Sequence, residues 1–280
     1  ARNTARGALR IIETLGVVGR QGLGWALGDR DALPERLRAT FESLGATYIK
    51  LGQFIASSPS LFPEEYVEAF QKCLDRTPPL SFHYIRGVVE EELGGSLEQH
   101  FQWVDPRPLA SASIAQVHAA RLHNGAEVVI KVQRPGVRNV LLTDFNFLYF
   151  SARVIESLAP GLSRSALSGV IEELQAGMME ECDFLQEARN LEQFNDFLAQ
   201  TGNRAVVAPR PIRSHTTTRV LTMERLHGMP ITDLGALREY TDDPAGVLIT
   251  ALNTWFSSLM LCDFFHADVH AGNLMVLEDG

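Results

Sequence analysis

The segment His266-Ala-Asp268-Val-His270-Ala-Gly-Asn273 places chemically useful side chains at fixed intervals. Phosphoryl transfer needs a carboxylate beside the attacking hydroxyl and a hard oxygen ligand for a magnesium ion. The spacing of this segment therefore predicts Asp268 as the catalytic carboxylate and Asn273 as a ligand of Mg2+. The alternative is a zinc site with His266, Asp268 and His270 as ligands, for which a fourth ligand is not apparent.

Lys131 is a candidate contact for a nucleotide. It ends the apolar segment Val128-Val-Ile-Lys131, which matches the kinase strand whose lysine holds the phosphates of ATP. An exposed strand end is the ordinary explanation of such a lysine. The nucleotide interpretation is favoured because Ala110 to Val117 matches the pattern G-x-G-x-x-G-x-V with alanine at each glycine position. The residues that we expect around ATP are Leu109, Ala110, Ser111, Ala112, Ser113, Ile114, Ala115, Gln116, Val117 and Lys131.

Alanine in this loop changes what the backbone can do. Glycine permits a positive φ and a close approach of the backbone, whereas alanine resists both. We expect a stiffer loop in which the hydroxyls of Ser111 and Ser113 can replace missing backbone donors. We also expect Ala112→Gly to change the affinity or preference for nucleotides. The alternative is a strand of small residues that packs tightly.

A kinase lysine needs a carboxylate partner from a helix that follows its strand. The segment 165–200 is typical of one long helix and offers Glu181, Asp183 and Glu187. On a regular helix Glu181 and Asp183 would point to different sides, so Glu187 is the expected ion-pair partner of Lys131. A solvated acidic stripe is the alternative for the other glutamates of this helix.

The Asp-Phe-Gly motif, whose aspartate is a metal ligand in kinases, is absent from the sequence. In that fold the motif follows a hairpin, and the chain stops at Asp279-Gly280, a dipeptide that favours such a turn. We therefore expect the chain to be a fragment with a truncated C-lobe, and we attribute the absent motif to truncation rather than to loss of function.

Helices precede these motifs. Pro34 suits the first turn of a helix, and an apolar stripe continues from it at four- and three-residue steps. Its members are Leu37, Phe41, Leu44, Tyr48, Leu51 and Ile55. Lys50 and Gln53 lie on the opposite side of this helix. Gly45 and Gly52 each cost about 1 kcal/mol of helix stability relative to alanine, so close packing against the backbone is expected there.

The remaining segments form a pattern typical of an α+β, protein-kinase-like two-lobe fold. Asn124-Gly125 predicts a hairpin turn. The expected helices are 4–28, 63–74, 82–93, 143–159, 165–200 and a region from 226 onward capped at Asp243-Pro244; the expected strands are 113–122, 126–133, 212–214, 219–223 and 274–277. We divide the chain into an N-terminal helical extension (1–104), a kinase-like N-lobe (105–225) and the start of a truncated C-lobe (226–280).

The composition narrows the classes of partner. The net charge of −9 argues against general binding of nucleic acid. An excess of arginine within residues 1–38 favours either contact with anionic lipid or a solvated helical face. Three cysteines without a C-x-x-C pair fit a reducing compartment and provide no zinc or disulfide framework. The uncharged stretch 245–262 approaches the length of a membrane span, but its polar residues favour a buried core helix.

Four ordered motifs together resemble the UbiB family of atypical protein-kinase-like proteins, also called the AarF or ADCK group. They are Lys50-Leu-Gly-Gln53, the alanine-rich loop, Glu181-x-Asp183 and the loop that ends at Asn273. The resemblance extends from Leu37 to the end of the chain. It implies that the helix with Lys50 and Gln53 is a regulatory plug, which folds over the active site and meets the acidic pair Glu181 and Asp183.

The same resemblance implies the roles of the remaining residues. Lys131 would bind the phosphates of ATP with Glu187 as its partner. Asp268 would be the catalytic aspartate, and Asn273 would be a ligand of Mg2+.

The family supports ubiquinone biosynthesis in proteobacteria and mitochondria and related lipid functions in plastids. The resemblance therefore implies an atypical kinase or ATPase with ATP and Mg2+ as cofactors. The implied partners are isoprenoid lipid, quinone-biosynthesis proteins and a membrane surface, with no nucleic acid. The implied location is the cytoplasmic side of a membrane, in bacteria the inner membrane, with peripheral attachment of the present chain.

Two other function classes remain open. A pseudokinase that serves as a nucleotide-gated scaffold for membrane biosynthetic enzymes is motivated by the alanine-rich loop and the plug. A conventional protein kinase is the weaker alternative, because a peptide substrate would compete with the plug for the same groove.

Overall fold

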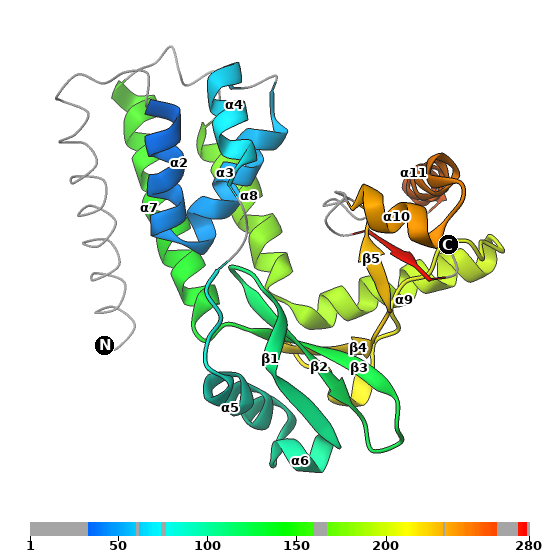
Figure 1. The fold of residues 1–280 in the computed structure, drawn as a ribbon. Coiled ribbons are helices and arrows are strands. Elements are labelled where there is room, and N and C mark those ends of the chain that lie inside the picture. Colours follow the sequence, from blue (N-terminus) through cyan, green and yellow to red (C-terminus); the bar gives the residue numbers. More distant parts are fainter. Residues whose placement is uncertain are drawn as a thin grey trace. The chain divides into compact units, whose positions relative to one another are not determined.

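The computed structural model describes residues 33–59, 62–73, 77–158, 167–231, 233–261 and 274–278 (Figure 1). The chain divides into two compact units that alternate along the sequence. The first unit comprises Ala1–Val88, Pro108–Gln116 and Val132–Asp183, and the second comprises Val89–Arg107, Val117–Lys131 and Phe184–Gly280. The predicted helix 4–28, the catalytic loop and the turn at 279–280 lie outside the described residues. The predicted domain boundaries stay predictions.

The apolar stripe that follows Pro34 lies on two helices instead of one. Helix α2 comprises Leu33–Leu44 and helix α3 comprises Ala46–Ser57. They are separated by Gly45, whose φ of 91° is accessible to glycine and strained for other residues. The prediction of one continuous helix is wrong. The break takes up only one residue, Gly45, so the apolar residues keep their helical spacing across it and the spacing does not reveal it.

Helix α3 packs closely on helix α4, which comprises Glu64–Gln71. A Cβ atom on Gly52 would lie 2.7 Å from Cδ1 of Phe70 and 3.2 Å from Sγ of Cys73. Phe70 is fully buried, and its ring meets that of Phe41 edge-on at a centroid distance of 5.1 Å. The close packing that the sequence predicts at this glycine is therefore present, and it excludes a larger residue.

Helices α7 (Val137–Leu158) and α8 (Leu167–Glu181) also belong to the first unit, and α3 packs against α7. The predicted helix 165–200 is wrong as a single element, since α8 ends at Glu181 and α9 comprises Phe184–Gln200. The carbonyl of Cys182 accepts a hydrogen bond of 2.9 Å from the side chain of Gln133, where a regular helix would supply a backbone donor.

A four-stranded sheet has the order β1-β2-β3-β4. Its strands are β1 (Trp103–Ser111), β2 (Ala115–Arg121), β3 (Glu127–Gln133) and β4 (Val220–Glu224). Gly125, with a φ of 88°, makes the predicted hairpin turn between β2 and β3. Strand β1 was not predicted. It contains Pro106 and Pro108, and its place at the edge of the sheet tolerates residues without an N–H donor.

The other described elements include two further corrections. Arg213–His215 is a short 3-10 helix, η2, rather than a strand, and Gly228–Pro230 is a strand, β5, in a region predicted as helical. Strand β5 pairs antiparallel with β6, Met275–Leu277. The remaining helices are α5 (Phe82–Leu93), α6 (Leu97–His100), α10 (Leu234–Tyr240) and α11 (Pro244–Leu261).

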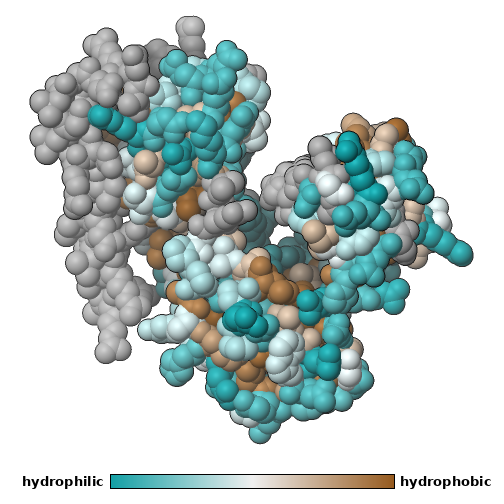
Figure 2. Space-filling view, in the orientation of Figure 1, coloured by the Kyte–Doolittle hydropathy of each residue, from teal (hydrophilic) through white to brown (hydrophobic). Residues whose placement is uncertain are grey.

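Helix α11 is the part of the uncharged stretch that the structure describes. Only 11% of it is buried, so the prediction of a buried core helix is wrong. Its exposed apolar side chains are Leu248, Ile249, Leu252, Phe256, Met260 and Leu261. Figure 2 shows hydrophobic residues among hydrophilic ones on the visible face of the region of α10 and α11. By length and composition α11 is long and apolar enough to cross a membrane.

Candidate functional site

Lys131 and Glu187 form an ion pair in the second unit. Nζ of Lys131, near the end of β3, donates to both carboxylate oxygens of Glu187 at 2.8 and 2.7 Å. The side chains are 28% and 33% exposed, so the pair is partly shielded from water and yet accessible. The structure thus brings together the lysine and the glutamate that the sequence singled out. Their role toward a nucleotide stays a prediction.

Phe184 helps to fix both members of this pair. It begins α9, is fully buried, and its ring centroid lies 5.0 Å from Nζ of Lys131, within the range of a cation–π contact. The backbone N–H of Phe184 donates to the carbonyl of Thr218 at 3.1 Å. These contacts hold the first turn of α9, which carries Glu187, so the carboxylate has a defined position.

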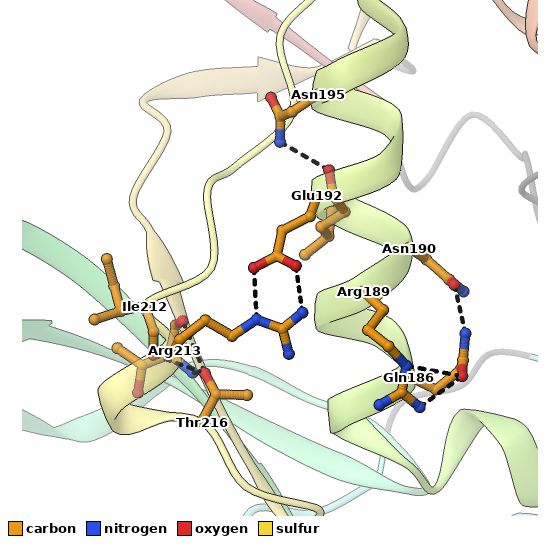
Figure 3. Close-up of polar contacts among 10 residues, drawn as sticks. Gln186, Arg189, Asn190, Glu192, Asn195, Ile212, Arg213 and Thr216 are labelled. Carbon is orange, nitrogen blue, oxygen red and sulfur yellow. Dashed lines mark hydrogen bonds and ion pairs between the residues drawn. The ribbon is translucent and has the colours of Figure 1, made fainter.

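A second ion pair holds α9 further along its length. Glu192 on α9 and Arg213 on η2 point toward one another and make two parallel hydrogen bonds, one of 2.5 Å from Nε (Figure 3). The hydrogen bond from Arg213 lowers the pKa of the Glu192 carboxyl. Since α9 also packs against β4, the helix is attached along its length to the elements around the sheet. The sequence did not indicate this pair, because its pattern predicts a strand over 212–214, where η2 lies.

The alanine-rich loop lies at the turn between β1 and β2. Leu109, Ala110 and Ser111 end β1, the residues 112–114 form the turn, and Ala115, Gln116 and Val117 begin β2. Ser113 is 4% exposed, and Oγ of Ser111 accepts a hydrogen bond of 2.8 Å from Nη2 of Arg134. The loop therefore lies at a turn between two strands, and both serines are already packed or bonded; its role toward a nucleotide stays a prediction.

The motif around Lys50 lies on α3 in the first unit. Nζ of Lys50 is 3.2 Å from Oε2 of Glu181 at the end of α8, and the lysine side chain is 18% exposed. Gln53 follows on the same helix, one turn further along. Asp183 lies beyond the end of α8 in the non-helical segment before α9. The structure thus brings Lys50 to the first member of the predicted acidic pair.

Asp268 and Asn273 lie outside the described residues. The structure therefore says nothing about the predicted catalytic carboxylate and magnesium ligand, or about the alternative zinc set with His266 and His270. Within the described ranges, no group of three or more His, Cys, Asp or Glu side chains is arranged to hold a metal ion.

The motifs of the sequence also do not single out Arg134. It follows β3 directly, and its guanidinium Nε donates to the carbonyl of Ala112 at 2.7 Å. An arginine after a strand belongs to none of the catalytic motifs, so no spacing rule identifies it. The Pro-Gly dipeptide that follows it was the available signal, since this dipeptide marks a turn that fixes the backbone at residue 134.

A family model described as the ABC1 atypical kinase-like domain matches residues 72–280. An uncharacterised chloroplastic aarF domain-containing protein kinase of Arabidopsis thaliana is 52% identical over 249 residues, which are 88% of this chain and 46% of the relative. A probable protein kinase UbiB of Azotobacter vinelandii is 36% identical over 241 residues, 86% of this chain and 44% of the relative. The chain spans about half the length of these relatives.

A solved structure is also similar. It is a Mycobacterium tuberculosis protein in complex with erythromycin, with 28% sequence identity and a TM-score of 0.59. The match covers 82% of this chain and 56% of that chain. Together with the family model, this similarity confirms the predicted kinase-like α+β fold class.

Proposed function

Because the chain belongs to the family of ABC1 atypical kinase-like domains, which includes the UbiB and AarF proteins, we propose that it binds ATP and Mg2+ and acts as an atypical kinase or ATPase. We place this activity in the biosynthesis of ubiquinone or a related isoprenoid quinone. The single observation that carries the nucleotide part of the proposal is the bidentate contact between Lys131 and Glu187.

The chemistry of this pair fits a phosphate group. A lysine ammonium has three donors, and Glu187 takes two of them, which leaves the third for a phosphate oxygen. The carboxylate of Glu187 and the ring of Phe184 hold the ammonium in place before a ligand arrives. An anionic ligand therefore meets a preorganised positive charge at the end of an apolar strand.

The other roles in the proposal follow the matched motifs. Asp268 orients the attacking hydroxyl and accepts its proton, and Asn273 would be a ligand of Mg2+, which would supply positive charge beside the phosphates. The contact between Lys50 and Glu181 supports a regulatory role for the segment Lys50-Leu-Gly-Gln53. Isoprenoid lipid, quinone-biosynthesis proteins and the cytoplasmic surface of a membrane are the proposed partners, and the arginines near the N-terminus support contact with anionic lipid.

The test uses the full-length protein and measures magnesium-dependent ATP binding by calorimetry and ATP turnover separately. Lys131→Met is expected to weaken ATP binding by roughly tenfold or more, because a charge-assisted hydrogen bond is lost. Lys72→Met is the matched control, since Lys72 is 65% exposed and pairs with Glu35 on α2. Equal ATP affinity of Lys131→Met and the control would overturn the assignment of Lys131.

Asp268→Asn separates chemistry from binding. This variant is expected to bind ATP normally and to lose ATP turnover. Undiminished turnover would remove Asp268 from the mechanism.

A nucleotide-gated scaffold is the second candidate function, and the burial of Ser113 and the bonded hydroxyl of Ser111 favour it. Both observations reduce the donors that the loop offers to phosphates. Complementation of a quinone-deficient strain with the Asp268→Asn gene distinguishes the two functions. Restored quinone production supports the scaffold, and failed complementation by a folded, ATP-binding variant supports the enzyme.

A further inference from the structure

In the first unit, Arg134 makes hydrogen bonds to several residues of the alanine-rich loop. Its Nε donates to the carbonyl of Ala112 at 2.7 Å, and its Nη2 donates to Oγ of Ser111 at 2.8 Å. Its backbone N–H donates to the carbonyl of Ile114 at 2.8 Å. Three of the six residues from Leu109 to Ile114 are therefore bonded to a single residue that lies outside the loop.

The same guanidinium also reaches the segment 77–80, which precedes α5. Nη2 of Arg134 donates to the carbonyl of Pro78 at 2.9 Å and lies 3.5 Å from that of Thr77. A guanidinium is planar and always charged, and its five donors have a fixed fork geometry. Arg134 therefore joins the loop to the segment 77–80 as a rigid bridge. A lysine, whose charge is compact and lies on a flexible side chain, could not replace it.

Gln116 provides a second link between the same two segments. Its side chain is fully buried, and its Oε1 accepts a hydrogen bond of 2.9 Å from the backbone N–H of Leu80. Its Nε2 donates to the carbonyl of Leu80 at 3.4 Å. In addition, the N–H of Thr77 donates to the carbonyl of Ser111 at 3.2 Å. The loop is thus fixed to the segment 77–80 along its length, from Ser111 to Gln116.

We propose that Arg134 is a positioning residue of the nucleotide loop, which fixes the loop on the segment 77–80 and thereby sets how closely the loop approaches the phosphates. The nucleotide part of this inference rests on the proposed function. Two features limit the motion of this loop. Its alanines restrict the backbone conformations, and the hydrogen bonds of Arg134 restrict the motion that remains. Loss of the bridge therefore frees the loop while the sheet stays folded.

Hydrogen exchange tests the bridge without any nucleotide. In full-length Arg134→Ala, the amides of Thr77 and Ala112 are expected to exchange about tenfold faster than in the wild type, because the bonds to Ser111 and Ala115 lose their support. Amides in the centre of β3 are expected to be unchanged. Arg121→Ala is the matched control, since Arg121 is 49% exposed and makes an ion pair with Glu127. Unchanged exchange at Thr77 and Ala112 would overturn the proposal.

Nucleotide kinetics test the positioning role. Arg134→Ala is expected to raise KM for ATP roughly tenfold and to change kcat by less than about twofold, because the loop contacts bound nucleotide and Arg134 acts through the loop. Arg134→Lys keeps the charge without the fork and is expected to lie between the wild type and Arg134→Ala. Faster exchange at the loop with the wild-type KM would overturn the positioning role. A kcat that falls in parallel with the loss of folded protein would assign Arg134 to stability alone and would also overturn it.

Ser111→Ala keeps the test decisive if Arg134→Ala does not fold. It removes one bond of the bridge and is expected to accelerate exchange at Ala112 by a smaller factor, roughly threefold. No acceleration in this variant would contradict the bridge. The proposed function has a separate test, since it is wrong if the wild type binds no nucleotide. In that case the exchange measurements still decide whether Arg134 holds the loop.

Discussion

The hydroxyl of Thr47 donates a hydrogen bond of 2.8 Å to the carboxylate of Asp144, which lies 97 residues later in the chain. Thr47 is fully buried, and Asp144 is 2% exposed. The bond joins α3 to α7, one helical turn from Lys50 on α3. A buried polar group is costly without a hydrogen-bond partner, so this contact both stabilises the packing of α3 on α7 and favours one position of α3.

Thr47→Val is expected to lower the free energy of unfolding by about 1–3 kcal/mol, because the buried carboxylate of Asp144 loses a donor while the shape of the side chain is kept. Urea unfolding followed by circular dichroism measures the change. Thr47→Ser is expected to keep most of the stability, since it keeps the donor.

The control for this change lies on α7. Thr143 donates to the carbonyl of Asn139 within its own helix, so Thr143→Val is expected to change stability by less than about 0.5 kcal/mol. If Thr47→Val lowered the free energy of unfolding by as little as this control, the hydrogen bond to Asp144 would make no net contribution to stability.

Gly52→Ala tests the close packing between α3 and α4. The new Cβ atom would lie 2.7 Å from the ring of Phe70, which is fully buried. We expect a loss of about 1–3 kcal/mol from overpacking, which exceeds the gain in helix propensity of about 1 kcal/mol. Thermal unfolding of the variant measures the sum.

Gly87→Ala is the matched control, because Gly87 is also helical and a Cβ atom there meets nothing within 4 Å. It is expected to gain up to about 1 kcal/mol of stability from helix propensity. Equal effects of the two substitutions would show that the contact with Phe70 is not tight in solution.

The buried imidazole of His118 makes stability depend on pH. His118 is fully buried in β2, and its Nδ1–H donates to the carbonyl of Asp105 at 2.8 Å. Burial lowers the pKa of His118 in the folded protein, and the hydrogen bond to Asp105 opposes this effect in part. The unfolded chain, with a histidine pKa of about 6.5, therefore binds the proton first as the pH falls.

The free energy of unfolding is expected to be unaffected by His118 above about pH 6.5 and to fall below it, until the folded pKa is reached. The slope from this one group is at most about 1.4 kcal/mol per pH unit. Urea unfolding at about pH 7.5 and about pH 5.5 measures the loss, which His118→Gln is expected to reduce. The control His83→Gln changes an exposed residue of α5, and a pH dependence shared by all three proteins would exclude His118 as a source.

Elements defined by local chemistry could be predicted from the sequence. Helix α5 has the predicted bounds. Strand β3 begins within one residue of the predicted start, because the hairpin dipeptide Asn124-Gly125 and the apolar run after it determine that start. The pairing of Lys131 with Glu187 followed from motif spacing in the same way. The error lay in the element that carries Glu187, since α9 is separate from α8.

The features that the sequence did not predict depend on tertiary contacts. The end of α8 is stabilised by a hydrogen bond from Gln133, 49 residues away from Cys182. The edge position of β1 accommodates Pro106 and Pro108, and only the pairing of the strands shows that β1 lies at an edge. The composition of α11 is compatible with a core, a membrane or a partner, and composition alone cannot distinguish these environments.

The contact between Arg134 and Thr77 spans 57 residues of chain, which include the whole of β1, β2 and β3. Bringing two residues so far apart in the chain together costs conformational entropy, which local contacts do not offset. The hydrogen bonds of Arg134 to the segment 77–80 therefore form only after the three strands have paired. During refolding, the alanine-rich loop should therefore acquire its final shape late. By the same reasoning it should be among the first parts to open when the native protein fluctuates, well before the strands beneath it separate.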